Sequence, residues 1–331
     1  MSGILTGKQE TGTEKTRLTL HKPKNERTCK MKAALIALGI GAGLAAGAAE
    51  LNWKTDKLWK KTESGEFTID YQNKKWPRLS SRQTVKAGKF YLVTFDCKRD
   101  GDSVPSLSLM ANDGGKNFGP SVYAFNTWTT QCAYFPAAKD GNMTVFFYLG
   151  PRAASKLTAR NGSFEEVTPE MMKRNLVVNG NFEDETFKGT GFWKSSNWKD
   201  TVLPGKVVEG AELTRGKKSL EIPFGKGIQS IFVPMEKGKK YQLSFWARGT
   251  QKGTCTAAFS LWNVKGHKGK HFWKSLNFKL ENDWKEYKFE VELPTDETVW
   301  PDLAVGTGTI SFIVKGSGGK YYLDDISYCE N

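Results

Sequence analysis

The sequence predicts an all-β protein in which two tandem antiparallel β-sandwiches follow a signal peptide. Three observations favour this fold class: apolar and polar residues alternate along many short segments, turn-forming residues separate these segments, and the second half of the chain repeats the first. The chain has 331 residues, which is enough for two domains. Apolar residues make up 38% of it and charged residues 25%, which is typical of a globular protein and excludes a disordered one.

A candidate signal peptide is the first element along the chain. A basic segment around Met31 precedes an apolar run, rich in Ala and Gly, at residues 33–49. This order is typical of a secretory signal, so we predict cleavage close to Ala48 or Ala49. The expected location is secreted, meaning extracellular, periplasmic or at the cell surface.

A membrane anchor is the alternative interpretation of this segment. The run is 17 residues long, at the lower limit for a bilayer span, and Ala and Gly insert weakly into membranes. We therefore expect cleavage and no stable membrane span. Residues 1–30 are polar and basic, and we interpret them as a spurious extension of the reading frame; the alternative is a cytoplasmic tail.

Loss of this segment changes the charge and the cysteine count. Residues 1–32 hold eight Lys or Arg and three Glu, so their removal lowers the net charge from +14 to +9. Cys29 is lost as well, and four cysteines remain, which in an exported chain makes one disulfide in each half plausible. Their pairing stays open, and no spacing among them is typical of a zinc site. The four are Cys97, Cys132, Cys255 and Cys329.

The internal repeat sets the domain boundaries. Residues 81–98 align with residues 231–248, and downstream Trp128 corresponds to Trp284. Matched pairs within the aligned segments are Gly88 and Gly238, Tyr91 and Tyr241, and Phe95 and Phe245. We predict an extension plus signal peptide at 1–49, a first sandwich at 50–166, a linker with one helical turn at 167–174, and a second sandwich at 175–331.

Strands within each half are expected to be half-buried. In residues 241–248 the apolar set Tyr241, Leu243, Phe245 and Ala247 alternates with Gln242, Ser244, Trp246 and Arg248. This period of two is typical of an antiparallel strand with one face on the core, so Trp246 is expected on the opposite face with Gln242 and Arg248. Turn signals such as Lys237-Gly238 separate the strands.

Several common enzyme classes are excluded by missing motifs. Only three His occur, and the chain has no HExxH, GxSxG, P-loop or dinucleotide-binding glycine pattern. Catalysis by a pair of carboxylates stays open.

Four motifs in the second half carry a family resemblance. They are NLVVNGNFE at residues 175–183, YQLSFWAR at 241–248, WKEY at 284–287 and KYYLDDIS at 320–327. In this order they resemble the cenC-type carbohydrate-binding modules, which are galactose-binding-like jelly rolls that accompany bacterial cellulases, laminarinases and xylanases. The resemblance covers residues 175–328. Residues 51–166 resemble a diverged copy, because they lack the NGxFE motif and have Thr158 to Gly162 in place of YLDDI.

Acidic residues near both ends of the second half suggest a cation site. NGNFE fits a first strand that ends in a Gly-assisted turn, and LDDIS fits a final strand. In a jelly roll the first and last strands lie close together, so Glu183 is expected near Asp324 or Asp325. Carboxylate oxygens placed in this way suit Ca²⁺, and the resemblance implies a structural calcium there. The alternative is that these acids cap turns or pair with Lys.

Aromatic side chains are the candidate carbohydrate ligands. A flat aromatic ring stacks on the C–H face of a sugar, while amide and charged groups bind its hydroxyls. The candidates in the second half are Trp193, Trp198, Trp246 and Trp262, with Gln242 and Arg248. Trp193 and Trp198 belong to FWKSSNW, which we predict as a loop; core packing is the alternative for each Trp.

A basic segment indicates which kind of polysaccharide could be preferred as ligand. Residues 263–274 hold four Lys, both remaining His and no acid. Clustered positive charge concentrates anionic ligands, so an acidic polysaccharide carrying uronate or sulfate is one expectation and a solvated loop is the other. Export and the resemblance argue against nucleic acid as the partner.

The function that these observations favour is an exported, non-catalytic carbohydrate-binding protein that holds polysaccharide by aromatic stacking and hydrogen bonding. Two alternatives stay open. One is an accessory part of a glycoside hydrolase, and the other is a cell-surface assembly or adhesion protein, for which an exposed apolar patch is the discriminating feature.

Overall fold

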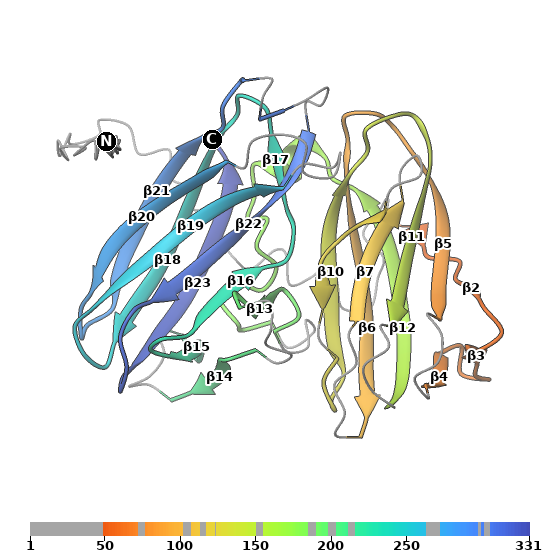
Figure 1. The fold of residues 1–331 in the computed structure, drawn as a ribbon, viewed down its shortest axis with the longest axis horizontal. Helices are drawn as coiled ribbons and strands as arrows, with labels where there is room; N and C mark the ends of the chain where they lie inside the picture. The colour runs from red at the N-terminus through yellow and green to blue at the C-terminus, as the bar shows by residue number, and fades with distance from the viewer. Residues whose placement is uncertain are drawn as a thin grey trace, which may run out of the picture. The chain divides into compact units, whose positions relative to one another are not determined.

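The computed structural model describes residues 49–71, 77–101, 107–112, 117–122, 124–149, 155–184, 190–197, 203–210, 216–262, 272–296, 299–300 and 305–331. The predicted signal peptide and Cys29 lie outside these residues. Within them, no helix is long and apolar enough to cross a membrane. The described chain is almost entirely β-structure, as predicted (Figure 1).

The first sandwich has two antiparallel sheets. One has the strand order β10-β6-β12-β4-β3, with β1 paired to β12, and the other has the order β2-β5-β11-β7-β8, with β9 paired to β7. Their strands are β1 (Ala49–Glu50), β2 (Lys54–Thr55), β3 (Lys60–Lys61), β4 (Phe67–Tyr71), β5 (Arg78–Val85), β6 (Phe90–Asp100), β7 (Leu107–Asn112), β8 (Asn117–Phe118), β9 (Ser121–Val122), β10 (Thr129–Pro136), β11 (Gly141–Leu149) and β12 (Ser155–Glu166).

The second sandwich repeats this plan. Its β22 sheet has the order β13-β16-β22-β19-β20, with β17 paired to β22, and its β18 sheet has the order β14-β15-β23-β18-β21. Their strands are β13 (Trp193–Ser195), β14 (Lys206–Glu209), β15 (Lys218–Pro223), β16 (Gly227–Ser230), β17 (Val233–Glu236), β18 (Lys240–Gly249), β19 (Gly253–Trp262), β20 (Trp273–Leu280), β21 (Lys285–Glu292), β22 (Val305–Val314) and β23 (Lys320–Glu330).

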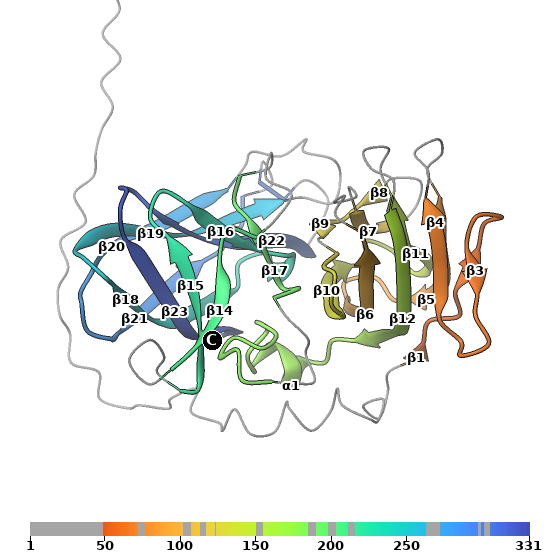
Figure 2. The ribbon, with the colours of Figure 1, turned by 90° about the horizontal axis from the view of Figure 1, so that it is seen from below.

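One helical turn follows β12, where the linker was predicted (Figure 2). Helix α1 (Pro169–Met172) begins after Thr168, whose side chain accepts a hydrogen bond from the N–H of Met171 at 3.3 Å. A Thr cap followed by Pro in the first helical turn explains why this short segment starts a helix.

The repeat is visible in side-chain contacts. The ring of Tyr91 stacks on Phe164 with centroids 4.8 Å apart, and the ring of Tyr241 stacks on Tyr328 at 5.0 Å. Each first Tyr also accepts a backbone N–H through its hydroxyl, Tyr91 from Lys86 at 2.8 Å and Tyr241 from Glu236 at 3.0 Å. The aligned sequence segments therefore form the same local structure twice.

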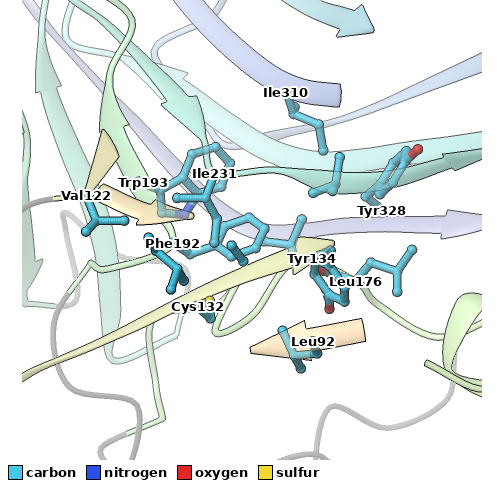
Figure 3. Close-up of a cluster of buried hydrophobic side chains, with 14 of the residues drawn as sticks. Leu92, Val122, Cys132, Tyr134, Leu176, Phe192, Trp193, Ile231, Ile310 and Tyr328 are labelled. Carbon is cyan, nitrogen blue, oxygen red and sulfur yellow. The ribbon is translucent and has the colours of Figure 1, made fainter. Parts of the chain in front are cut away.

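The two sandwiches share one apolar core. Figure 3 shows side chains from both in one cluster: Leu92, Val122, Cys132 and Tyr134 come from the first, and Leu176, Phe192, Trp193 and Ile231 from the second. The hydroxyl of Tyr134 donates to the carbonyl of Leu176 at 3.1 Å, and the N–H of Tyr134 donates to the carbonyl of Phe232 at 3.4 Å. The edge strand β10 thus has a partner beyond its own sandwich.

The expected disulfides are absent from the described residues, where the four cysteines are buried thiols. On β10, Cys132 lies opposite Thr94, which is three residues from Cys97 along β6, so the two thiols point to opposite faces of the sheet. In the second sandwich, Cys255 belongs to β19 and Cys329 to β23, which lie in different sheets. Burial raises the pKa of Cys97, Cys132 and Cys255, which keeps these thiols protonated.

Candidate functional site

The segment that carries the NGNFE motif is held against the last strand. The side chain of Asn175 accepts from the N–H groups of Val177 at 2.9 Å and Tyr328 at 3.0 Å, and donates to the carbonyl of Ile326 at 2.9 Å. Gly180 is required here, because a Cβ atom at this position would lie 2.0 Å from the carbonyl oxygen of Ile326. The predicted closeness of the two ends of the module is confirmed.

The NGNFE segment does not form the first strand that the sequence predicts. Residues 175–183 form turns and bends, with φ of 50° at Asn179 and 59° at Phe182. Left-handed residues interrupt a strand, so the motif docks on β23 through side-chain and isolated backbone hydrogen bonds.

An acidic cavity lies where this segment meets β15 and β23. It has a volume of about 570 Å³ and is lined by Asn181, Glu183, Gly216, Lys217, Asp324 and Asp325. Glu183 Oε1 accepts from the N–H groups of Lys217 at 2.5 Å and Lys218 at 2.8 Å. Gly216 is needed for this approach, since a Cβ there would lie 2.5 Å from Glu183 Oε1.

The two aspartates of the LDDIS motif have different surroundings. Asp324 is buried, and its Oδ2 accepts from the hydroxyl of Ser219 at 2.9 Å while its Oδ1 accepts from the N–H of Asp325 at 2.7 Å. Asp325 is exposed and has a φ of 46°, which lets the strand bulge at this point. Glu183 was expected near Asp324 or Asp325, and the structure places it in one cavity lining with the two aspartates.

This cavity has suitable donor chemistry for a calcium ion, because carboxylate and amide oxygens of four residues line it. The present side-chain positions do not complete a site: within the described residues no three Asp, Glu, His or Cys side chains converge closely enough to hold a metal. The alternative prediction, that these acids cap turns, matches the backbone hydrogen bonds of Glu183 and Asp324.

The outer face of the β18 sheet carries Gln242, Trp246 and Arg248, as the alternation predicted. These three side chains are half-buried, while their neighbours on β18 point into the core. The guanidinium of Arg248 lies over the ring of Tyr322, 5.7 Å from its centroid. The pKa of Tyr322 is raised by burial and by its hydrogen bond, 3.1 Å long, to Glu221.

The structure places Trp193 in the core, outside the candidate site. Trp193 begins β13 and is 2% exposed, and it packs on Phe192 and Phe312 with ring centroids 5.5 and 5.9 Å away. A ring in this position cannot stack on a sugar, so the predicted binding role and the predicted loop are both wrong for Trp193. Trp198 lies outside the described residues. Trp262 ends β19, where its backbone pairs with Thr307.

Trp273 is an exposed aromatic residue that is not among the carbohydrate ligands predicted from the sequence. It begins β20 and its side chain is 48% exposed. Its backbone lies opposite Ser260, and Ser260 lies opposite Thr309 on β22, so these three positions form a row across the outer face of the β22 sheet. The sequence signal for it is the alternation of residues 273–280, which places Trp273 on the same face of the strand as Ser275 and Asn277. Most of the basic segment, 263–271, lies outside the described residues.

The outer face of the β22 sheet is also rich in uncharged polar groups. The amide of Gln229 donates to the hydroxyl of Thr309 at 2.6 Å, and the hydroxyl of Thr256 donates to the amide oxygen of Asn277 at 2.6 Å. Amides and hydroxyls beside an exposed indole match the chemistry of a sugar, which presents both hydroxyls and apolar C–H faces.

Three solved structures of carbohydrate-binding modules are similar to this chain. The tandem CBM22-1–CBM22-2 domain from Paenibacillus barcinonensis Xyn10C is 13% identical, and the match covers 84% of this chain and 93% of that chain with a TM-score of 0.36. A family 16 carbohydrate binding module is 22% identical, over 47% of this chain and 100% of that chain, with a TM-score of 0.36. For TmCBM61, solved with beta-1,4-galactotriose, the identity is 18%, the coverage 48% and 100%, and the TM-score 0.34.

A comparison with curated proteins gave no match. A family model described as carbohydrate binding domain matches residues 174–320. This range contains the docked NGNFE segment, the acidic cavity's first acid, both polar faces and every strand of the second sandwich up to the start of β23. Residues 174–320, which make up most of the second sandwich, therefore match the carbohydrate binding domain family, as the four motifs indicated.

Proposed function

We propose that this protein binds polysaccharide without cleaving it, through the second sandwich. The observation that carries the proposal is the family match over residues 174–320 together with the exposed Trp273 on a face of amides and hydroxyls. We favour the outer face of the β22 sheet over that of the β18 sheet, because Trp246 is half-buried while Trp273 is exposed enough for a sugar to stack on it.

The absence of catalysis is supported by the charge of this face. Glycoside hydrolysis uses two carboxylates that flank the bond. Among the described residues at outward positions of the β22 sheet, the register places one acid, Glu236 at the end of β17, and no second carboxylate to work with it. A glycan at the exposed β20 edge of this face would meet the indole of Trp273, the hydroxyl of Ser275 and the amide of Asn277, which bind sugar without supplying an acid or a nucleophile.

Three tryptophan variants test the proposal. Trp273→Ala is expected to weaken glycan binding by about 1 kcal/mol or more, roughly fivefold in Kd, with little change in stability. Trp246→Ala tests the β18 sheet in the same way, and Trp193→Ala is the control for a buried ring. Binding is measured on a glycan array followed by titration calorimetry, with reducing-sugar release recorded for every glycan bound. Unchanged binding in both surface variants, or release of reducing sugar, would overturn the proposal.

We also propose a structural calcium ion in the acidic cavity, with Glu183, Asp324 and Asp325 as its carboxylate ligands. The support is the oxygen-rich lining and the placement of three acids around one cavity. Bound calcium would neutralise these acids and fasten the NGNFE segment to β23. Such a role is structural, at a distance from the chemistry of sugar binding.

Export is the remaining proposal. Cleavage close to Ala48 or Ala49 fits the start of the first sandwich, because the N–H of Leu51 donates to the carbonyl of Gly162 at 2.9 Å and so belongs to the fold. Intact-mass measurement of the protein recovered outside the cytoplasm tests it. A mature chain that still contains Met1 to Lys30 would show that the proposed signal peptide is wrong.

A further inference from the structure

Lys194 is a cationic side chain on the outer face of the β22 sheet. It lies in β13 opposite Gln229, Gln229 lies opposite Ser311, and Ser311 lies opposite Ala258 in β19. Ala258 in turn lies opposite Ser275 in β20. At about 4.8 Å between strands, this row of five positions spans roughly 19 Å across the sheet.

Lys194 has no ion-pair partner among the described residues. No described carboxylate lies within 4.0 Å of its ammonium nitrogen, and the acid at an outward position of this sheet, Glu236 of β17, lies opposite Val305, six residues along β22 from Ser311. Burial lowers the pKa of Lys194, which is the response expected of an ammonium group that has lost water without gaining a partner. A half-buried, unpaired cation costs stability, and an anion that arrives with the ligand removes this cost.

The groups beside Lys194 are suited to the same ligand. The amide of Gln229 is held in place by its donation to Thr309, 2.6 Å away. An ammonium group beside fixed, uncharged polar side chains attracts an anion. The β18 sheet differs, because its outward positions in β21 carry Glu286 and Glu290.

We propose that Lys194 recognises an anionic substituent, a uronate carboxylate or a sulfate ester, on a glycan bound at the outer face of the β22 sheet. The inference rests on the proposed function. It gives the predicted preference for acidic polysaccharide a specific residue, in addition to the basic segment at 263–274. The ammonium of Lys194 would donate charge-assisted hydrogen bonds to the anion while the sugar stacks elsewhere on the face.

The test compares matched charged and neutral polysaccharides. The probes are polygalacturonate with its fully methyl-esterified form, and dextran sulfate with dextran, each titrated at low and high NaCl. The variant is Lys194→Met, which keeps the apolar stem and removes the charge. Lys279→Met is the control, because Lys279 is an exposed lysine on β20 of the same sheet, opposite Thr254. Lys194→Arg tests rescue by another cation.

We expect Lys194→Met to weaken binding of one charged form by about tenfold or more, as loss of a charge-assisted hydrogen bond does, and to leave the neutral form within about twofold. Loss on polygalacturonate identifies a carboxylate as the ligand group, and loss on dextran sulfate identifies a sulfate. Its thermal midpoint should stay the same or rise, because a desolvated charge is removed, and this separates binding from folding. Lys279→Met should have little effect, and Lys194→Arg should retain the preference.

Several outcomes would overturn the inference. Equal binding of charged and neutral forms by the unmodified protein, or the same small loss in Lys194→Met and Lys279→Met, would show that Lys194 recognises no anion. A preference that disappears only when Lys265, Lys268 and Lys270 are changed to Gln would assign it to the basic segment. If neutral glycans are still bound in these cases, the proposed function stands; binding to no glycan overturns both.

Discussion

In the first sandwich Trp59 packs on Phe147 with ring centroids 5.8 Å apart, and in the second Trp193 packs on Phe312 at 5.9 Å. Each Phe then meets the aligned Phe of β6 or β18, Phe95 at 4.9 Å and Phe245 at 4.8 Å, in T-shaped geometry. Neither indole N–H has a hydrogen-bond partner within the described structure. The repeated trio shows that both Trp residues belong to the core, and that the two halves preserve ring geometry although their sequences have diverged.

The two halves differ where their last strands bulge. Asn161 in β12 and Asp325 in β23 both have positive φ, 54° and 46°, so the bulge itself is repeated. The residue before it is Arg160 in the first half and Asp324 in the second. Arg160 Nη1 lies 3.1 Å from Glu66 Oε1, and the hydroxyl of Ser219 lies 2.9 Å from Asp324 Oδ2.

Strand pairing shows that the residues that differ at the two bulges occupy equivalent positions. Phe67 pairs with Ala159 and Leu220 pairs with Leu323, so Glu66 and Ser219 occupy equivalent positions next to Arg160 and Asp324. The first half holds a guanidinium between acids at the bulge, because Arg160 Nε also lies 3.8 Å from Asp96 Oδ2. The second half instead places acids around a cavity. If the proposed calcium ion binds in the second half, Arg160 is the cation that takes its place in the first half.

The equivalence of the two cores gives the largest expected effect. Trp59→Ala and Trp193→Ala should each lower the free energy of unfolding by ~3–5 kcal/mol, because each removes a large buried ring and leaves a cavity. Chemical denaturation measures both, with Trp273→Ala as an exposed control expected to change stability by less than about 0.5 kcal/mol. A small effect at only one of the two buried positions would break the comparison.

Calcium should distinguish the halves at their bulges. If Glu183, Asp324 and Asp325 bind the ion, free calcium at about 100 times its Kd should stabilise the protein by ~2.7 kcal/mol, and a chelator should reverse this. Glu183→Gln should abolish the stabilisation by calcium. Glu66→Gln is the control in the first half, where Glu66 contacts Arg160 at the bulge, and it should leave the stabilisation intact. Thermal unfolding with and without chelator is the measurement. An equal response in Glu183→Gln would contradict the calcium proposal.

The sequence was sufficient to predict features that depend on local pattern. Alternation in residues 241–248 placed Trp246 on the outer face, and the order of the motifs brought Glu183 to Asp324. These predictions succeeded because a strand has a period of two and because a jelly roll joins its ends. Trp193 failed because β13 is three residues long, too short for alternation to indicate which side of the strand faces the core.

Contacts between the halves were harder to predict. All eight residues of β10 are buried, whereas its counterpart β21 alternates between exposed and buried residues. Both faces of β10 carry apolar residues, Cys132 and Tyr134 on one and Ala133 and Phe135 on the other. This pattern indicates a strand that is buried on both sides. The partner at residues 190–193 and 231–232 is distant in sequence, and no local pattern identifies it.

The ion pairs of Arg160 predict a smaller effect, confined to the first half. Arg160→Gln should lower the free energy of unfolding by about 1–2 kcal/mol, because Arg160, Glu66 and Asp96 are only partly shielded from solvent, with side-chain exposures of 30%, 26% and 13%. Lys156→Gln is the control on the same strand, since its pair with Asp100 is 3.9 Å long and exposed. The loss should be the same with calcium and with chelator. A loss that appears only in chelator would contradict the view that Arg160 replaces a bound ion.

The smallest expected effect tests how far the two halves act as one body. Tyr134→Phe removes the hydroxyl that donates to Leu176 across the shared core, and Tyr328→Phe removes a similar buried bond, 3.0 Å long, to the carbonyl of Pro234 within the second sandwich. Each should cost about 0.5–1.5 kcal/mol, because each deletes one buried hydrogen bond. Hydrogen exchange separates them: only Tyr134→Phe should lower the protection of β10 relative to β6, since it loosens the contact that covers this edge strand. If Tyr328→Phe lowers the protection of β10 as much, the bond between Tyr134 and Leu176 has no special part in holding the halves together, and their coupling rests on the apolar cluster alone.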